Sequence, residues 1–283
     1  MSATLRSTLA EALGSPVSAL APVTGGDIND AYAATLATGE QVFVKTRADA
    51  PAGMYAREAE GLAWLAEAGA LRTPQVRLVR DDMLVLTFVA RAPRQHDFDL
   101  QLGRGLAAVH RFGAPCFGWS RDNFIANLPQ DNRALPTFAA LYRERRLMPL
   151  VQRARERGLL EPRDSAAFDR LYPRLGQLLG PEEPPARVHG DLWSGNVHVD
   201  QTGAPMLIDP AVYGGHRELD LAMLSLFGSP SEDFFAAYDE HYPRAPGSRE
   251  RVALLQLYPL LVHVNLFGGA YVAQLRAALA QYV

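Results

Sequence analysis

The spacing of hydrophobic residues predicts mixed strands and helix in the first third of the chain. Polar and apolar residues alternate over 31–36 and over Gln41–Thr46, and the short polar turn between them predicts a β-hairpin. Residues 54–68 have a helical composition, and apolar strands are expected over 74–79 and 83–89. The expected order is therefore strand, strand, helix, strand, strand.

The pattern changes after residue 89. A break in the pattern at 90–94 predicts a hinge. At the other end of the chain, an amphipathic helix is expected before the strands, over Ser2–Leu13 with Ser2 as its N-cap. Three helices are then expected at 98–111, 137–157 and 164–179, followed by short strands and loops over 187–209 and by further helices. We expect an α+β fold of two lobes: a small one over residues 1–90, with an antiparallel sheet and one packed helix, and a larger, mainly helical one over 91–283.

Composition excludes several classes of function. The chain has 283 residues, a net charge of −3 and no basic stripe interleaved with aromatic residues, so a nucleic-acid partner is not expected. The single cysteine, Cys116, excludes an internal disulfide and suits a reducing cytoplasm. The N-terminus has no signal-peptide core, and no apolar run approaches the roughly 20 residues of a membrane span. We expect a cytoplasmic protein that does not bind membranes.

Three oxygen-bearing side chains have the spacing of a phosphoryl-transfer site. Asp191 and Asn196 are five positions apart, as the Asp and Asn of a kinase catalytic loop are, and Asp209 follows the next apolar run. ATP phosphates are held through Mg²⁺, which prefers one or two carboxylates besides phosphate oxygens. We therefore predict Asn196 and Asp209 as Mg²⁺ ligands and Asp191 as the base that orients the attacking hydroxyl.

Lys45 gives a second, independent indication. It is the only lysine among 28 basic residues, and it lies by the apolar run 42–44, within the predicted strand Gln41–Thr46. An arginine can replace lysine on a solvated face, but a compact ammonium approaches phosphate where a planar guanidinium does not fit. We predict that Lys45 holds the ATP phosphates; a leftover surface lysine is the alternative.

A carboxylate from the following helix should orient Lys45. Glu58 shares a helical face with the apolar residues Met54 and Leu62, whereas Glu60 lies with Glu67 on a more exposed face. Glu58 is therefore the preferred partner, although either glutamate could instead be a solvated helix residue.

Two further segments are candidates for nucleotide binding. Gly25 and Gly26 precede the hairpin, and their backbone N–H groups could cover phosphate because glycine has no Cβ. The backbone of Thr87, Phe88 and Val89, at the end of the last predicted strand, could contact adenine. A simple turn and an ordinary strand end are the alternatives.

Other residues near the motif have structural explanations to weigh. His189 could bind a metal, but a histidine that braces the loop is the preferred interpretation. Asp220 could hold the backbone of the same loop, or it could interact favourably with the positive end of the dipole of its own helix. His110 lies on an apolar helix and is expected in the core. Trp193, two residues after Asp191, is either buried or a platform on which a sugar stacks.

Together these residues resemble the fructosamine kinase (ketosamine 3-kinase) family, which belongs to the aminoglycoside-phosphotransferase and choline-kinase branch of the protein-kinase-like fold. The resemblance covers nearly the whole chain. It is most specific in the runs HGDLWSGN at 189–196, IDPA at 208–211 and YGGHRELDLAM at 213–223, with supporting matches at 122–125, 129–130 and 143–147.

The resemblance implies an ATP- and Mg²⁺-dependent kinase that phosphorylates the 3-hydroxyl of a ketosamine. The product is unstable and releases the amine, which is deglycation. The resemblance implies the roles given above and adds that Trp193 and His263 line the sugar pocket, although His263 also fits a core position. The phosphate-loop cysteine of some relatives is absent, so their disulfide-linked dimer is not expected, and we expect a monomer or weak dimer.

Two other functions remain open from the sequence. The chain could phosphorylate another small hydroxyl compound, such as an aminoglycoside, choline or homoserine. It could also be a catalytically dead nucleotide-binding module. The complete set Lys45, Asp191, Asn196 and Asp209 argues against the second alternative.

Overall fold

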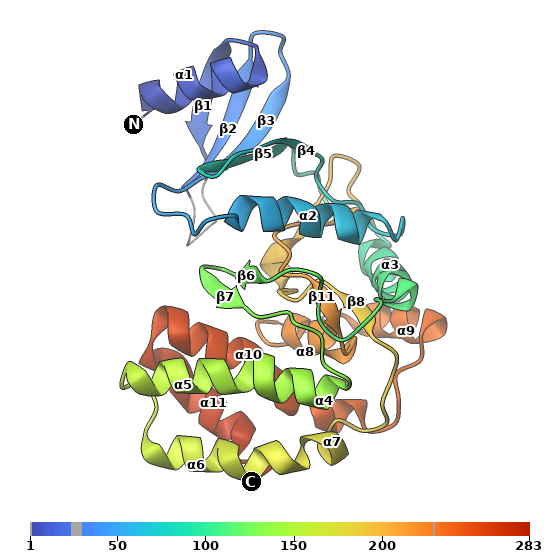
Figure 1. Cartoon of the computed structure of the whole chain (residues 1–283). Coiled ribbons are helices and arrows are strands. Elements are labelled where there is room, and N and C mark those ends of the chain that lie inside the picture. Colours follow the sequence, from blue (N-terminus) through green and yellow to red (C-terminus); the bar gives the residue numbers. More distant parts are fainter. Residues whose placement is uncertain (1, 24–29, 229) are drawn as a thin grey trace.

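The computed structural model describes residues 2–23, 30–228 and 230–283 and has two lobes (Figure 1). The smaller lobe contains a five-stranded antiparallel sheet with the order β1-β2-β3-β5-β4. Its strands are β1 (Val17–Pro22), β2 (Asp30–Leu36), β3 (Gln41–Thr46), β4 (Val76–Val79) and β5 (Met83–Thr87). The helices α1 (Ser2–Leu13) and α2 (Met54–Ala66) belong to the same lobe.

The two faces of this sheet pack against different helices. Alternate residues of β3 and β5, among them Val42 and Val85, form one core with Leu9 of α1. The intervening residues of β5, such as Leu84, form a second core with Tyr55 and Leu62 of α2. Side chains alternate between the two faces along a strand. The first four residues of β5 are therefore all apolar and buried, and every second position of β3 faces α2.

Most of the predicted elements of this lobe are confirmed, but β1 was not predicted from the sequence. β1 is an edge strand, and Val17 is its only fully buried residue. An edge strand with little buried surface has no clear apolar alternation, so its sequence did not indicate a strand. The predicted strand at 83–89 ends earlier, at Thr87.

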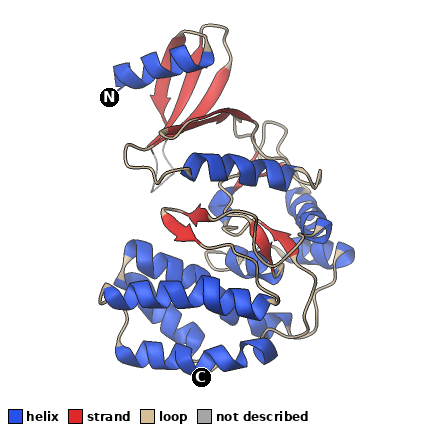
Figure 2. Ribbon diagram, in the orientation of Figure 1, coloured by secondary structure: helices blue, strands red, loops and turns tan. Residues whose placement is uncertain are grey.

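The larger lobe is mainly helical, as predicted (Figure 2). Its helices include α3 (Phe98–Phe112), α4 (Phe138–Leu141), α5 (Met148–Glu156), α6 (Pro162–Leu171), α7 (Leu175–Leu178), α8 (Glu218–Leu224), α9 (Glu232–His241), α10 (Ser248–Phe267) and α11 (Val272–Leu279). Three short antiparallel pairs accompany them: β6 (Asn123–Ile125) with β7 (Leu128–Gln130), β8 (Ala186–Val188) with β11 (Tyr213–Gly215), and β9 (Val197–Val199) with β10 (Pro205–Leu207).

Two predicted helices are more complex than their patterns indicated. The helix expected at 137–157 begins after the N-cap Thr137 and contains a π-helical segment, Tyr142–Leu147, between α4 and α5. The helix expected at 164–179 is divided by the 3₁₀ turn Tyr172–Arg174, which contains a proline that lacks the N–H needed to continue the α-helix.

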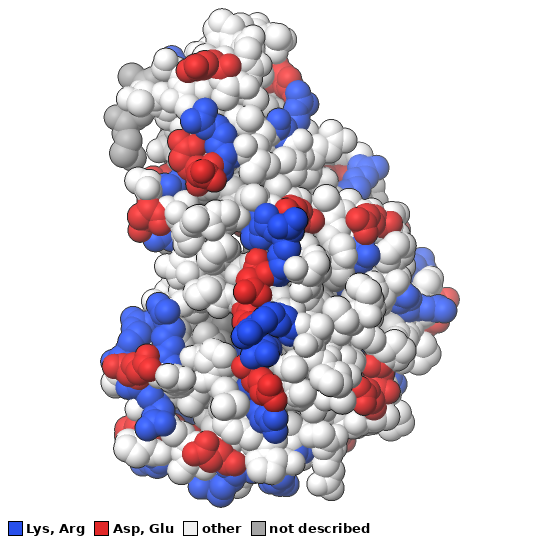
Figure 3. All heavy atoms as spheres, viewed as in Figure 1, with Lys and Arg blue, Asp and Glu red and all other residues white. Residues whose placement is uncertain are grey.

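Basic and acidic side chains are interspersed on the face shown in Figure 3, without a large patch of one sign. No helix in the described ranges is both long and apolar enough to cross a membrane.

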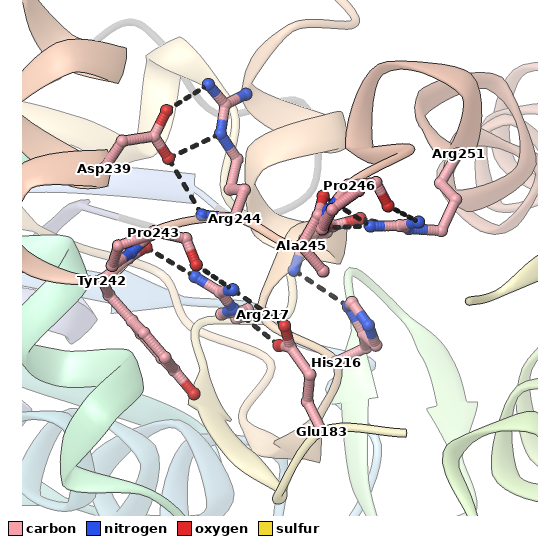
Figure 4. A network of polar contacts seen from close by, with 11 residues as sticks. Glu183, His216, Arg217, Asp239, Tyr242, Pro243, Arg244, Ala245, Pro246 and Arg251 are labelled. Carbon is pink, nitrogen blue, oxygen red and sulfur yellow. Dashed lines mark hydrogen bonds and ion pairs between the residues drawn. The ribbon is translucent and has the colours of Figure 1, made fainter. Parts of the chain in front are cut away.

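Buried ion pairs fix the start of α8 in the larger lobe. Arg217 forms a bidentate ion pair with Glu183 and also donates to the carbonyls of Tyr242 and Pro243 (Figure 4). The next residue, Glu218, accepts two hydrogen bonds of 2.8 Å from Arg251 of α10. These contacts hold α8 against the preceding connector and against α10.

Arg251→Ala should destabilise the protein by about 3–5 kcal/mol, because it leaves the buried carboxylate of Glu218 without its counter-charge. Urea unfolding followed by circular dichroism measures this change. Arg249→Ala, which removes an exposed arginine from the same helix, is the matched control. Equal unfolding free energies for the two variants would show that the buried pair does not hold α8.

Candidate functional site

Lys45 is buried between two carboxylates from different lobes. It lies on the face of β3 that packs against α2, and its side chain is 7% exposed. Its ammonium contacts Glu58 Oε1 at 2.7 Å and also donates to Asp209 Oδ1. Burial lowers the pKa of Lys45, but the charges of Asp209 and Glu58 outweigh burial, so the pKa is raised and the lysine stays charged.

Glu58, and not Glu60, is the partner of Lys45, as the helical pattern predicted. The Glu58 side chain is 11% exposed, and burial raises its pKa while Lys45 lowers it. Glu60 instead pairs with Arg57 on the outer face of α2, where its side chain is 39% exposed. The alternative of a surface lysine is wrong for Lys45.

Asp209 is held in an unusual backbone conformation. Its φ of 56° lies in the left-handed region, which aspartate adopts more readily than most residues. The segment after it packs closely under α2, since a Cβ added at Gly61 would lie 3.3 Å from Pro210 and 3.4 Å from Val212. The carboxylate is thereby presented to Lys45, with 41% of its side chain exposed.

Asp191 and Asn196 are joined by their own loop. The Nδ2 group of Asn196 donates to the Asp191 carbonyl at 2.8 Å and to its carboxylate at 3.2 Å. These bonds use the nitrogen of the amide, so the Oδ1 atom of Asn196 is available as a ligand. An amide oxygen and the carboxylate of Asp209 are donors that fit Mg²⁺, which needs few protein ligands when phosphate supplies the rest.

The pKa of the Asp191 carboxyl is raised to about 7, first by its burial and then by the negative charge of Asp209. A raised pKa makes the carboxylate a stronger base. A divalent cation held by Asp209 would offset that negative charge and lower the pKa of Asp191 again.

Asp220 holds the backbone of the loop that carries Asp191. Its two oxygens accept hydrogen bonds from the N–H groups of His189 and Gly190, at 2.7 and 3.0 Å. His189 donates from Nε2 to the carbonyl of Ile208 at 2.9 Å, so it braces the loop as preferred from the sequence. His110, 1% exposed, contacts the same Asp220 carboxylate and is a core residue, as expected.

A second group of buried polar residues was not singled out individually from the sequence. Asn123 donates to the carbonyl of Val212 at 2.9 Å, and Gln130 donates to the carbonyl of Ala211 at 3.1 Å. Tyr258 of α10 in turn donates to the Gln130 side chain. The β6–β7 hairpin therefore positions the segment that follows Asp209. A polar residue at the end of each short strand is too common a pattern to predict this role.

The predicted adenine-binding segment lies at the end of β5. The Thr87 N–H donates to the carbonyl of Gln75 at 2.8 Å, and the Val89 carbonyl accepts a bond from His198 at 3.0 Å. The Phe88 N–H also donates to the carbonyl of Gln41, at 3.4 Å. A base would therefore have to contact the Phe88 carbonyl and the Val89 N–H. Gly25 and Gly26 lie outside the described residues.

Trp193 and His263 belong to one group of rings and are linked through Phe227. Trp193 is 38% exposed and makes an edge contact with Phe227, whose ring lies 4.8 Å from that of His263. Trp193 is therefore not a core residue, and His263 is only partly buried. Phe227 was missed because its loop is distant in sequence from both residues that it joins.

Lys45→Arg should weaken Mg·ATP binding by roughly tenfold or more, because a guanidinium does not fit between the two carboxylates and a phosphate. Isothermal titration calorimetry on the folded variant measures the affinity. Arg47→Lys is the matched control, since it makes the reverse exchange two residues away in a surface pair with Asp49. Wild-type affinity in Lys45→Arg would exclude Lys45 from phosphate binding.

Comparisons with known proteins agree with this arrangement. A fructosamine kinase family model matches residues 1–283. A protein of Synechocystis named "Probable ketoamine kinase" is 39% identical over 266 residues, covering 92% of this chain and 88% of the relative. The crystal structure of a "putative fructosamine-3-kinase" from Thermobifida fusca is 41% identical with a TM-score of 0.91, covering 99% of this chain and 98% of the other.

More distant structures show the same fold. A choline kinase from Streptococcus pneumoniae is 15% identical with a TM-score of 0.68, covering 100% of this chain and 98% of the other. The bilobal, protein-kinase-like architecture expected from the sequence is therefore confirmed. The sole lysine contacts carboxylates from both lobes. Because the family model matches the whole length of the chain, the chain belongs to the fructosamine kinase family, and its fold is that of a phosphotransferase.

Proposed function

We propose that this kinase transfers the γ-phosphate of ATP to the 3-hydroxyl of a ketosamine, such as a fructosamine or ribulosamine. The single observation that carries the proposal is the complete catalytic set, in which Lys45 and Glu58 of one lobe meet Asp209 of the other beside the Asp191 loop. The family supports a kinase of this type, and the exposed Trp193 beside Asp191 supports a sugar as acceptor.

In the proposed reaction, Asp191 orients the 3-hydroxyl and accepts its proton as the oxygen attacks the γ-phosphorus. A P–O bond forms to the acceptor, the bond between the γ-phosphorus and the bridging oxygen breaks, and ADP leaves. Lys45, oriented by Glu58, would hold the α- and β-phosphates. Asn196 and Asp209 would hold Mg²⁺, which supplies charge neutralisation for the phosphates.

The backbone of 87–89 would contact adenine, and Gly25 and Gly26 would cover the phosphates. The division of the chain into a nucleotide-covering lobe at 1–90 and an acceptor-binding lobe at 91–283 is part of the same proposal. The resulting 3-phosphate would be unstable and would release its amine, so the reaction would remove sugars from glycated amines.

A coupled assay for ADP formation tests the acceptor. We expect turnover with fructosamines or ribulosamines and little turnover with choline, homoserine or an aminoglycoside. Phosphorylation of one of these other compounds and of no ketosamine would replace the proposal with a different small-molecule kinase. ATP binding without turnover of any acceptor would favour the dead nucleotide-binding module.

Asp191→Asn should lower kcat by about 10²–10⁴-fold, because the amide cannot accept the proton of the hydroxyl. Its affinity for Mg·ATP should stay close to that of the wild type, since Lys45, Asn196 and Asp209 are retained. Steady-state kinetics and calorimetry measure the two quantities. Asp169→Asn on the exposed face of α6 is the control, and more than a tenth of wild-type turnover in Asp191→Asn would remove Asp191 from this role.

A further inference from the structure

Five rings form one group at the edge of the site, which we call the aromatic cluster: Trp193, Phe227, His263, Phe267 and Tyr271. The rings of Phe227 and Tyr271 lie 4.8 and 4.9 Å from the His263 ring, and Phe267 lies 5.5 Å from it. The members come from the catalytic loop, from the segment after α8, from the end of α10 and from the turn before α11. Phe227, Phe267 and Tyr271 have no role in the proposed phosphoryl transfer.

Three of the five rings of the aromatic cluster are exposed, which is unusual for large apolar side chains. Phe227 and Trp193 are each 38% exposed and Phe267 is 47% exposed. Contiguous exposed apolar surface on a protein marks a binding site more often than scattered residues do. The cluster begins at Trp193, two residues after Asp191, so its ligand would be continuous with the molecule whose hydroxyl reacts.

His263 presents a hydrogen-bond acceptor within the aromatic cluster. Its Nδ1 lies 2.7 Å from the carbonyl of Pro259, and because a carbonyl can only accept, Nδ1 carries the proton. In the neutral ring, Nε2 then has a free lone pair, and it has no hydrogen-bond partner among the residues that the structure describes. Burial lowers the pKa of His263 and the bond to Pro259 opposes this, with the balance favouring the neutral ring.

We propose that the part of the aromatic cluster formed by Phe227, His263, Phe267 and Tyr271 binds the amine end of the acceptor, a protonated secondary amine together with the group attached to its nitrogen. This inference rests on the proposed function and deepens it. A cation is attracted to ring faces, and an ammonium N–H can donate to His263 Nε2. The hydroxyls of a sugar would each need hydrogen-bond partners, of which ring faces supply few.

The proposal gives each end of the acceptor its own position. The sugar would lie at Trp193 with its 3-hydroxyl at Asp191, and the nitrogen substituent would extend over Phe227 toward His263. Selectivity for sugar amines over free sugars would then come from the segment after α8 and from the end of α10, not from the catalytic loop.

Phe227→Leu and Phe227→Tyr separate a cation–π contact from simple apolar contact. Leucine keeps an apolar side chain but has no ring face, whereas tyrosine keeps the ring. We expect Phe227→Leu to raise KM for a ketosamine about five- to tenfold with KM for ATP unchanged, and Phe227→Tyr to stay within about twofold of the wild type. Phe112→Leu makes the same change at an exposed phenylalanine on α3 and should have no effect.

A second comparison uses the charge of the ligand. An N-acetylated ketosamine, whose nitrogen is uncharged, should bind the wild type more weakly than the parent compound, measured as KM or as an inhibition constant. Equal affinity for both compounds, or equal behaviour of the leucine and tyrosine variants, would overturn the amine subsite while ketosamine turnover continued. If the wild type phosphorylates no ketosamine at all, the proposed function fails, and this inference fails with it.

Discussion

The contact of one buried lysine with two carboxylates joins the lobes of this protein. Lys45 comes from the sheet, Glu58 from the helix that covers one face of that sheet, and Asp209 from the larger lobe. A buried ammonium is costly unless it is paired, and the buried carboxylate of Glu58 would be costly without the lysine. The position of α2 and the position of the Asp209 segment are therefore linked, and Gly61 allows the two to approach closely.

The larger lobe supplies the rigid support that this contact requires. Asp220 holds the backbone at His189 and Gly190, while the β6–β7 hairpin holds the backbone after Asp209. The neighbouring residues Arg217 and Glu218 anchor the start of the same helix through buried pairs. One short run of sequence thus fixes both the start of α8 and the backbone of the loop that carries Asp191.

The sequence predicted those features that depend on local periodicity. Alternation over Gln41–Thr46 predicted the hairpin strand that carries Lys45, and helical spacing in α2 distinguished Glu58 from Glu60. In contrast, β1 could not be predicted, because an edge strand buries little and shows no alternation. The aromatic cluster was predicted only in part, since its rings meet through folding of loops that are distant in sequence.

The most direct test of this account is the position of the phosphate in the product. A ketosamine labelled with ¹⁸O in its 3-hydroxyl would be incubated with the enzyme, ATP and Mg²⁺ and followed by ³¹P NMR. The account predicts a new phosphate signal that carries the ¹⁸O isotope shift and then decays as the free amine appears. A new phosphate signal without that isotope shift would show transfer to another hydroxyl and would contradict the account.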